Sequence, residues 1–123
     1  MARRVLVIDD DEPVRRLLAD FMSSFGYEVE AASDGVEGLT LFAQGRHDLV
    51  VTDVRMPGVN GWDVVRGVRR IRPDVAIVVV SGIETEITHA GDDITGLDRL
   101  VFLPKPVSLE ELRRAIDEVL GSR

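Results

Sequence analysis

Short apolar runs alternate along the chain with longer segments in which apolar residues recur every three or four positions. The runs have the length of β-strands and are rich in valine, whereas the spacing in the longer segments is typical of amphipathic helices. The run at 75–80 is continuously apolar, which is typical of a strand covered on both faces. The runs predict five strands, at Val5–Ile8, Tyr27–Ala31, Leu49–Thr52, Val75–Val80 and Leu100–Leu103.

The segments between the runs predict helices. Pro13 suits a first helical turn and Gly26 suits a helix end, with apolar residues at helical spacing between them. Further helices are expected from Asp34 to about Gln44, from Trp62 to Arg72, and after Ser108, where Glu111 completes a capping box.

The segment from Glu84 to Arg99 departs from this regularity. It carries Gly91, Gly96 and several β-branched residues, which are poor helix formers. We therefore expect its helix, the fourth of five, to be short or irregular, and the segment to be the most mobile part of the chain.

Strands that alternate with helices indicate an α/β fold, in which a parallel sheet is covered by helices on both faces. The length of 123 residues corresponds to a single domain, expected to span residues 1–123. In such a sheet a ligand site lies beyond the carboxyl ends of the strands, at a switch in strand order. The side chains that directly follow the strands are therefore the candidates for chemistry.

The composition narrows the function classes. A net charge of −7 argues against direct nucleic-acid binding by this domain, because phosphates would be repelled. No apolar run approaches the roughly 18–20 residues of a membrane span, and the first residues do not form a secretory signal. Cysteine is absent, which excludes disulfides and thiolate metal sites. We expect a cytoplasmic protein without membrane contact.

Five polar side chains follow the predicted strands. Asp9 and Asp10 come after the first strand, Asp53 after the third, Ser81 after the fourth and Lys105 after the fifth. Three carboxylates brought together repel one another, and a hard divalent cation with oxygen ligands, such as Mg²⁺, resolves that conflict. A carboxylate flanked by a cation and an ammonium group suits an incoming phosphoryl group, with aspartate as the nucleophile.

In order and spacing these residues match a family motif over essentially the whole chain. The sequence resembles the receiver domains of two-component response regulators. Each piece is weak alone, but their joint spacing is highly specific. The matching pieces are Val7-Ile8-Asp9-Asp10 with Arg15, Asp53 with Met56-Pro57-Gly58 and Gly61, Ser81, and Phe102 followed by Lys105-Pro106.

The resemblance implies a role for each matching residue. Asp53 is expected to be the phosphoacceptor and Lys105 to pair with the phosphoryl oxygens. Ser81 is expected to be the hydroxyl that moves toward the phosphoryl group, and Phe102 the aromatic ring that follows it, although core packing explains Phe102 equally well. For Mg²⁺ the implied ligands are Asp10, Asp53 and the backbone carbonyl of Arg55, with Asp9 acting through water.

The resemblance also implies a fold and partners. It predicts a flavodoxin-like doubly wound sheet with strand order 2-1-3-4-5, five helices and a cis Lys105-Pro106 bond. A sensor histidine kinase or a histidine phosphotransfer protein would supply the phosphoryl group. Control of an attached output domain or of a homodimer stays open, and the domain is expected to be a signalling module rather than an enzyme.

Three alternative functions fit the residues less well. A degenerate receiver would act only in protein interaction, but all five polar residues are in place. A haloacid-dehalogenase-like phosphatase fits Asp9-x-Asp11 loosely, yet requires an acidic pair where Ser81-Gly82 stands. A flavodoxin-like flavin protein requires a hydroxyl- and glycine-rich loop where the chain has an acidic one.

Several other residues are expected to have structural or surface roles. Asp11 and Glu12 suit the start of a helix. Trp62 lies near the loop after Asp53 and could report on the site, but a structural role is favoured. His47 and His89 are expected at the surface. Arg66, Arg69, Arg70 and Arg72 are expected to form a solvated basic face.

Two positions depart from the usual family pattern. Arg55 lies two residues after Asp53, and Ile83 lies two residues after Ser81. A long cation beside an apolar residue could shield the phosphoryl group from water, so we expect a long-lived phosphorylated form.

Overall fold

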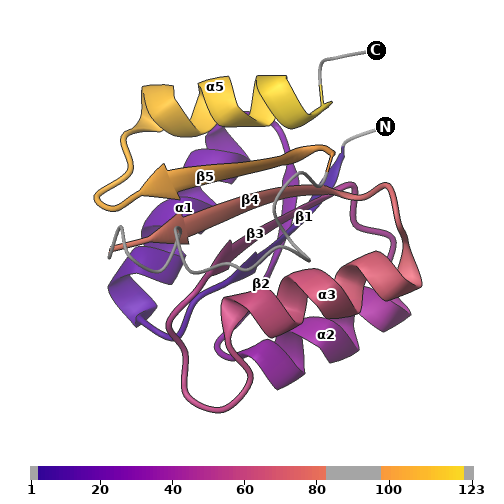
Figure 1. Cartoon of the computed structure of the whole chain (residues 1–123). Helices are drawn as coiled ribbons and strands as arrows, with labels where there is room; N and C mark the ends of the chain where they lie inside the picture. The colour runs from indigo at the N-terminus through magenta and orange to yellow at the C-terminus, as the bar shows by residue number, and fades with distance from the viewer. Residues whose placement is uncertain (1–2, 83–97, 121–123) are drawn as a thin grey trace.

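A five-stranded parallel sheet lies at the centre of the molecule, in the order β2-β1-β3-β4-β5 (Figure 1). The structure, a computed structural model, describes residues 3–82 and 98–120. All five predicted strands are present within one residue of the expected bounds, and the predicted fold class and strand order are confirmed. The strands are Arg4–Ile8 (β1), Glu28–Ala32 (β2), Leu49–Asp53 (β3), Ala76–Ser81 (β4) and Leu100–Pro104 (β5).

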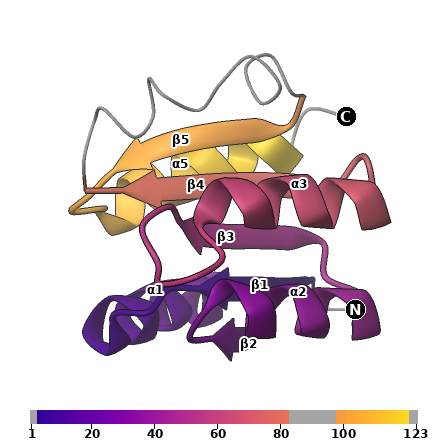
Figure 2. The same ribbon diagram turned by 60° about the horizontal axis from the view of Figure 1, so that its bottom comes forward.

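Helices cover both faces of the sheet. Helices α2 and α3 lie on one face and α1 and α5 on the other, as Figures 1 and 2 show. Each pair closes its own apolar core against alternate residues of the same strands. The described helices are Glu12–Ser24 (α1), Gly35–Gln44 (α2), Gly61–Ile71 (α3) and Leu109–Leu120 (α5). None of them has the length and apolar run needed to cross a bilayer.

Burial separates the central strands from the edges. Every residue of β3 and β4 is buried, as are Val5–Ile8 of β1, whereas β2 and β5 are partly exposed. This explains the sequence pattern, because a strand covered on both faces needs apolar residues at every position. The polar residues Asp53 and Ser81 interrupt that rule at the ends of β3 and β4.

Polar side chains fix the helix starts. The carboxylates of Asp11 and Asp34 accept hydrogen bonds from backbone N–H groups of the first turns of α1 and α2. The predicted capping box of the last helix is confirmed, since Ser108 Oγ accepts from the N–H of Glu111 at 3.1 Å and Glu111 Oε1 accepts from the N–H of Ser108 at 3.1 Å. A second box, between Asn60 and Asp63, starts α3 directly after the loop that follows Asp53.

The expectation that His47 lies at the surface is wrong. Its side chain is fully buried between α2 and β3, stacks on Phe42 with ring centroids 5.9 Å apart, and places Nε2 2.7 Å from Oε1 of Glu30. Gly45 makes room for this ring, because a Cβ there would lie 2.6 Å from Cε1 of His47. A loop histidine is buried here by tertiary packing that no local pattern records.

The basic face predicted on α3 is solvated only in part. Arg69 donates to the carbonyls of Val75 at 3.0 Å and of Asp98 at 2.6 Å, so it ties α3 to the residues before β4 and β5. Arg72 donates to the carbonyl of His47 and lies 5.0 Å from the ring centroid of Phe42. These two arginines therefore serve the fold rather than forming a free basic surface.

Some expectations fall outside the described residues. The predicted fourth helix, with its expected irregularity and mobility, lies almost entirely within residues 83–97, as do Ile83 and His89.

Candidate functional site

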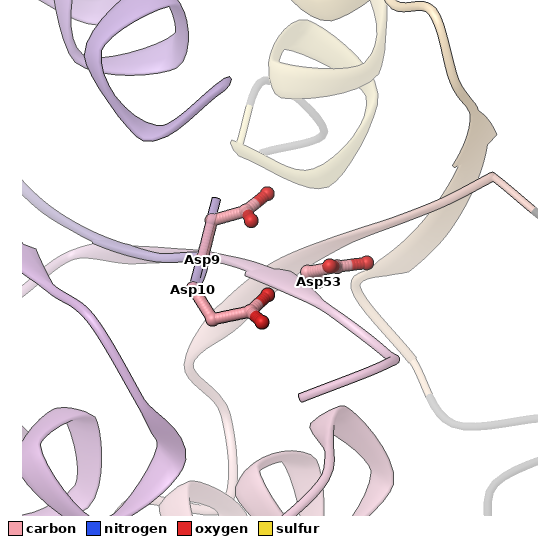
Figure 3. A group of neighbouring side chains, drawn as sticks. All are labelled: Asp9, Asp10 and Asp53. Atoms are coloured by element: carbon pink, nitrogen blue, oxygen red, sulfur yellow. The ribbon is translucent and has the colours of Figure 1, made fainter. Parts of the chain in front are cut away.

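Three carboxylates meet at the carboxyl ends of β1 and β3. Asp9 and Asp10 directly follow β1, and Asp53 is the last residue of β3. One carboxylate oxygen from each lies within 4.8 Å of the others, and in Figure 3 all three groups project to the same side. Asp9 and Asp53 are buried and Asp10 is exposed, so the cluster opens to solvent at Asp10.

The side chain of Asp9 is held from several directions. Its Oδ1 accepts from the N–H of Asp11 at 2.9 Å, and its Oδ2 lies 3.1 Å from Nζ of Lys105. Its backbone carbonyl accepts from Nη1 of Arg15 at 2.9 Å, which fastens the end of β1 to α1. Both carboxylate oxygens of Asp9 thus already have protein partners.

Lys105 brings the only ammonium group among the residues predicted for the site. Its Nζ lies 3.1 Å from Oδ2 of Asp9 and 3.2 Å from Oδ2 of Asp53, so one cation bridges two of the carboxylates. Its backbone N–H donates to the carbonyl of Ser81 at 2.8 Å, which carries the pairing of β4 and β5 one step beyond Pro104. The Lys105-Pro106 bond is cis, as the resemblance implied.

The environment shifts the protonation of both bridged groups. Burial raises the pKa of Asp53, and the charge of Asp9 raises it further, against the opposing effects of Lys105 and of the Val54 N–H. Burial lowers the pKa of Lys105, but the carboxylates of Asp53 and Asp9 outweigh it, so that this pKa lies above its ordinary value. The site therefore holds a firmly charged ammonium beside a carboxylate that ionises at some cost.

The loop after Asp53 packs tightly on the phosphoacceptor candidate. The N–H of Val54 donates to Oδ1 of Asp53 at 2.7 Å. The N–H of Gly61 donates to the carbonyl of Val54 at 2.8 Å, and a Cβ at Gly61 would lie only 2.1 Å from the carbonyl oxygen of Asp53. Only glycine permits this approach, which places the start of α3 directly against Asp53.

The remaining predicted residues surround the cluster. Ser81 ends β4 with 1% of its surface exposed, and Asp53 pairs in register with its neighbour Val80. The half-buried Phe102 lies on β5, and Arg55 is exposed beside a hollow of about 410 Å³ whose lining includes Asn60. The structure thus brings Asp9, Asp10, Asp53 and Lys105 into one group, with Ser81 at the next strand end.

Two contacts of this region were not foreseen from the sequence. Arg15 is part of the family motif, but the spacing of the residues does not predict its hydrogen bond to the carbonyl of Asp9. The ring of Trp62, a residue for which a structural role is predicted, meets that of Phe102 edge to face, with centroids 5.4 Å apart, and no sequence pattern indicated this partner.

The donor set suits a hard divalent cation. The clustered ligand atoms are carboxylate oxygens, the chain has no cysteine, and His47, the histidine among the described residues, does not belong to the group. Such oxygen-only sets are typical of Mg²⁺ sites, which often use only one or two carboxylates from the protein. Three carboxylates and the single ammonium of Lys105 leave a net negative charge, which such an ion would offset.

Comparison with known proteins identifies the family of the chain. Residues 5–117 match the family model of the response regulator receiver domain. The chain belongs to this family. A receiver domain is a signalling domain rather than a true enzyme, as expected.

The related sequences are response regulators. Response regulator MprA of Mycobacterium sp. (strain KMS) is 43% identical over 114 residues, which are 91% of this chain and 48% of that protein. MprA of Mycobacterium tuberculosis (strain ATCC 25618 / H37Rv) is 41% identical over the same length. The receiver domain described here therefore spans about half the length of these curated relatives.

Solved structures share the fold of this receiver domain. The chemotaxis protein CheY4 of Vibrio cholerae has a TM-score of 0.87 at 28% identity, and the match covers 98% of this chain and 100% of that one. The response regulator protein TrrA of Thermotoga maritima, solved in complex with Mg²⁺-BeF, has a TM-score of 0.83 at 29% identity, covering 96% and 99% of the two chains.

Proposed function

We propose that this receiver domain, as a single unit over residues 1–123, accepts a phosphoryl group on Asp53 from a histidine kinase or a histidine phosphotransfer protein. The observation that carries the proposal is the ammonium of Lys105, 3.2 Å from Oδ2 of Asp53 at the edge of a three-carboxylate cluster. Of those carboxylates, Asp53 is held at its Oδ1 by the neighbouring N–H of Val54 and lies at the end of a fully buried strand. A nucleophile needs such a fixed position.

The proposed transfer exchanges one bond to phosphorus for another. The P–N bond of a phosphohistidine in the donor breaks while a P–O bond forms to a carboxylate oxygen of Asp53, and the electron pair stays on the imidazole nitrogen. Lys105 neutralises charge on the phosphoryl oxygens, and the hydroxyl of Ser81 donates a hydrogen bond to them. In the later hydrolysis water attacks phosphorus, the P–O bond to Asp53 breaks, and the carboxylate and inorganic phosphate are released.

The residues that would hold Mg²⁺ are Asp10, Asp53 and the carbonyl of Arg55. Asp9 is assigned an indirect role through water, because its two carboxylate oxygens already accept from the N–H of Asp11 and from Lys105. When bound, the ion offsets negative charge on the carboxylates and on the phosphoryl oxygens.

Phosphorylation is proposed to act by shifting a conformational equilibrium. The buried hydroxyl of Ser81 lies at the strand end next to that of Asp53 and can turn toward an added phosphoryl group. A group that binds one conformation better than another changes their populations by that difference in affinity. The output would be an attached domain or a partner protein.

A neighbouring apolar pocket suits the phosphodonor protein. It has a volume of about 270 Å³ and lies between α1 and the loop after β5, with Lys105 in its wall. Leu17, which lines it, exposes 47% of its surface although it is apolar. A donor that presents its phosphohistidine to Asp53 beside Lys105 can place an apolar side chain here, so we assign donor docking to this pocket.

The decisive experiment is phosphorylation by acetyl phosphate in the presence of Mg²⁺. The wild-type chain should gain one acid-labile phosphoryl group, measured by intact-protein mass spectrometry, and the Asp53→Asn variant should gain none. Asp48→Asn, at the opposite end of β3, is a matched control and should be labelled like the wild type. Labelling that persists in Asp53→Asn would refute Asp53 as the acceptor.

A further inference from the structure

We propose that Trp62, at the start of α3, positions the ring of Phe102 and thereby couples α3 to the phosphorylation of Asp53. The inference rests on the proposed acceptance of a phosphoryl group by Asp53 and adds a positioning residue to it. Trp62 is the single tryptophan of the chain, so its fluorescence can be read without interference from other indole rings.

The two rings make a defined contact. Their centroids are 5.4 Å apart and their planes are inclined by 65°, an edge-to-face arrangement that aromatic pairs favour. Trp62 exposes 7% of its surface, whereas Phe102 is only half-buried on the edge strand β5. Trp62 is thus the enclosed member of the pair, against which the ring of Phe102 is held.

The pairing of β4 and β5 connects Phe102 to Ser81. Val79 lies opposite Phe102 and Ser81 lies opposite Pro104. Because side chains two positions apart project from the same face of a strand, Ser81 and Phe102 lie on the same face of the sheet. Val79 and Trp62 belong to one apolar cluster, against which Phe102 packs, so this is the face covered by α3. In a close-packed interior, a turn of the Ser81 side chain changes the space next to Phe102.

The start of α3 connects Trp62 to Asp53. Gly61, the preceding residue, has no room for a Cβ beside the carbonyl of Asp53 and donates its N–H to the carbonyl of Val54 at 2.8 Å. Trp62 is therefore fixed by its backbone to the phosphoacceptor loop and by its ring to Phe102. If Trp62 were only a core residue, its burial would be explained, but its contact with Phe102 would not need to change when Asp53 is phosphorylated.

Fluorescence provides the first test. The wild-type chain is titrated with beryllofluoride in the presence of Mg²⁺, with Mg²⁺ alone as the reference, while binding is followed independently by isothermal titration calorimetry. We expect the Trp62 emission to change on binding, and Phe102→Leu to bind beryllofluoride but to lose most of that change. An emission change of full size in Phe102→Leu would overturn the proposal.

A double-mutant cycle provides the second test. The dissociation constant for beryllofluoride is measured calorimetrically for wild type, Trp62→Leu, Phe102→Leu and the double variant. We expect Trp62→Leu to change the constant by about 2- to 10-fold, the range typical of aromatic pairs, and to have no further effect in the Phe102→Leu background. Trp62→Phe, which keeps an aromatic ring, should restore most of the wild-type constant.

Two outcomes separate the causes of failure. Val119→Ala, a buried substitution under the opposite face of the sheet, is the control for lost stability and should bind beryllofluoride like the wild type. If Trp62→Leu behaves like Val119→Ala, or if the two ring substitutions are additive, Trp62 is only a core residue. If the wild type itself binds no beryllofluoride through Asp53, judged against Asp53→Asn, the proposed function fails and the coupling fails with it.

Discussion

The environment of Asp53 disfavours ionisation of its carboxyl group, because burial and the charge of Asp9 raise its pKa above the ordinary 3.8. A raised pKa in the folded state means that the protonated carboxyl favours folding and that ionisation costs stability. We therefore expect Asp53→Asn to raise the free energy of unfolding at pH 7 in EDTA. The gain should shrink as the pH falls through the raised pKa, and vanish below the pKa of an unfolded aspartate.

Urea titrations across this pH range measure the effect. Asp20→Asn, on the exposed side of α1, is the matched control for the loss of one negative charge. A lower stability of Asp53→Asn at pH 7 would show that its contacts with Lys105 and Val54 outweigh burial.

Arg55 is exposed beside the loop that carries the proposed phosphoacceptor. If its long side chain restricts the approach of water to the phosphoryl group, Arg55→Ala should speed the loss of phosphate by roughly 2- to 10-fold, equivalent to about 0.4–1.4 kcal/mol in the barrier. Release of labelled phosphate after removal of acetyl phosphate measures the rate. Arg46→Ala, in the loop before β3, is the control. Equal rates in the wild type, Arg55→Ala and Arg46→Ala would refute the shielding role of Arg55.

The contact of α3 with Asp53 leaves no room for a side chain at Gly61. A Cβ there would lie 2.1 Å from the carbonyl oxygen of Asp53. This oxygen belongs to the backbone, so it cannot relieve the clash by a change of rotamer. We expect Gly61→Ala to cost about 1–3 kcal/mol of stability, in the range of overpacked sites, and to slow phosphorylation by acetyl phosphate.

Gly67 offers a matched control on the same helix. Its added Cβ would meet only the flexible end of Leu39, and alanine is the better helix former by about 1 kcal/mol. Gly67→Ala should therefore stay near wild-type stability and activity. Equal losses in the two variants would indicate a general sensitivity of α3 and not a specific approach to Asp53.

The apolar pocket between α1 and the loop after β5 can be tested through Leu17. Since Leu17 is 47% exposed, Leu17→Ala should change stability by less than about 1 kcal/mol. We expect slower phosphoryl transfer from a phosphorylated histidine phosphotransfer protein but an unchanged rate with acetyl phosphate, which needs no docking surface. Val36→Ala, on α2 and 61% exposed, should affect neither rate. A Leu17→Ala chain that accepts normally from the protein donor would exclude the pocket as a docking site.

The strands could be predicted from the sequence because burial on both faces forces an unbroken apolar run, as in Val75–Val80. The grouping of Asp9, Asp10, Asp53 and Lys105 followed from the same sheet, since the carboxyl ends of parallel strands share one edge. His47 and Arg69 could not be placed in this way. The buried ring of His47 depends on Phe42 and Gly45, and the partly buried Arg69 is held by backbone carbonyls of distant residues. The sequence periodicity does not indicate these partners.

Folding itself assembles the proposed ion site, because Asp10 and Asp53 lie far apart in the sequence and meet only through the pairing of β1 with β3. A ligand that binds only the folded chain stabilises it by mass action. Mg²⁺ at 100 times its dissociation constant should therefore add about 2.7 kcal/mol to the free energy of unfolding, relative to EDTA at equal ionic strength. Urea unfolding measures the gain, and Asp10→Asn should lose most of it while Asp11→Asn, whose carboxylate caps α1, should keep it. An equal gain in Asp10→Asn would place the ion elsewhere, because nonspecific screening and binding outside the cluster do not depend on that carboxylate.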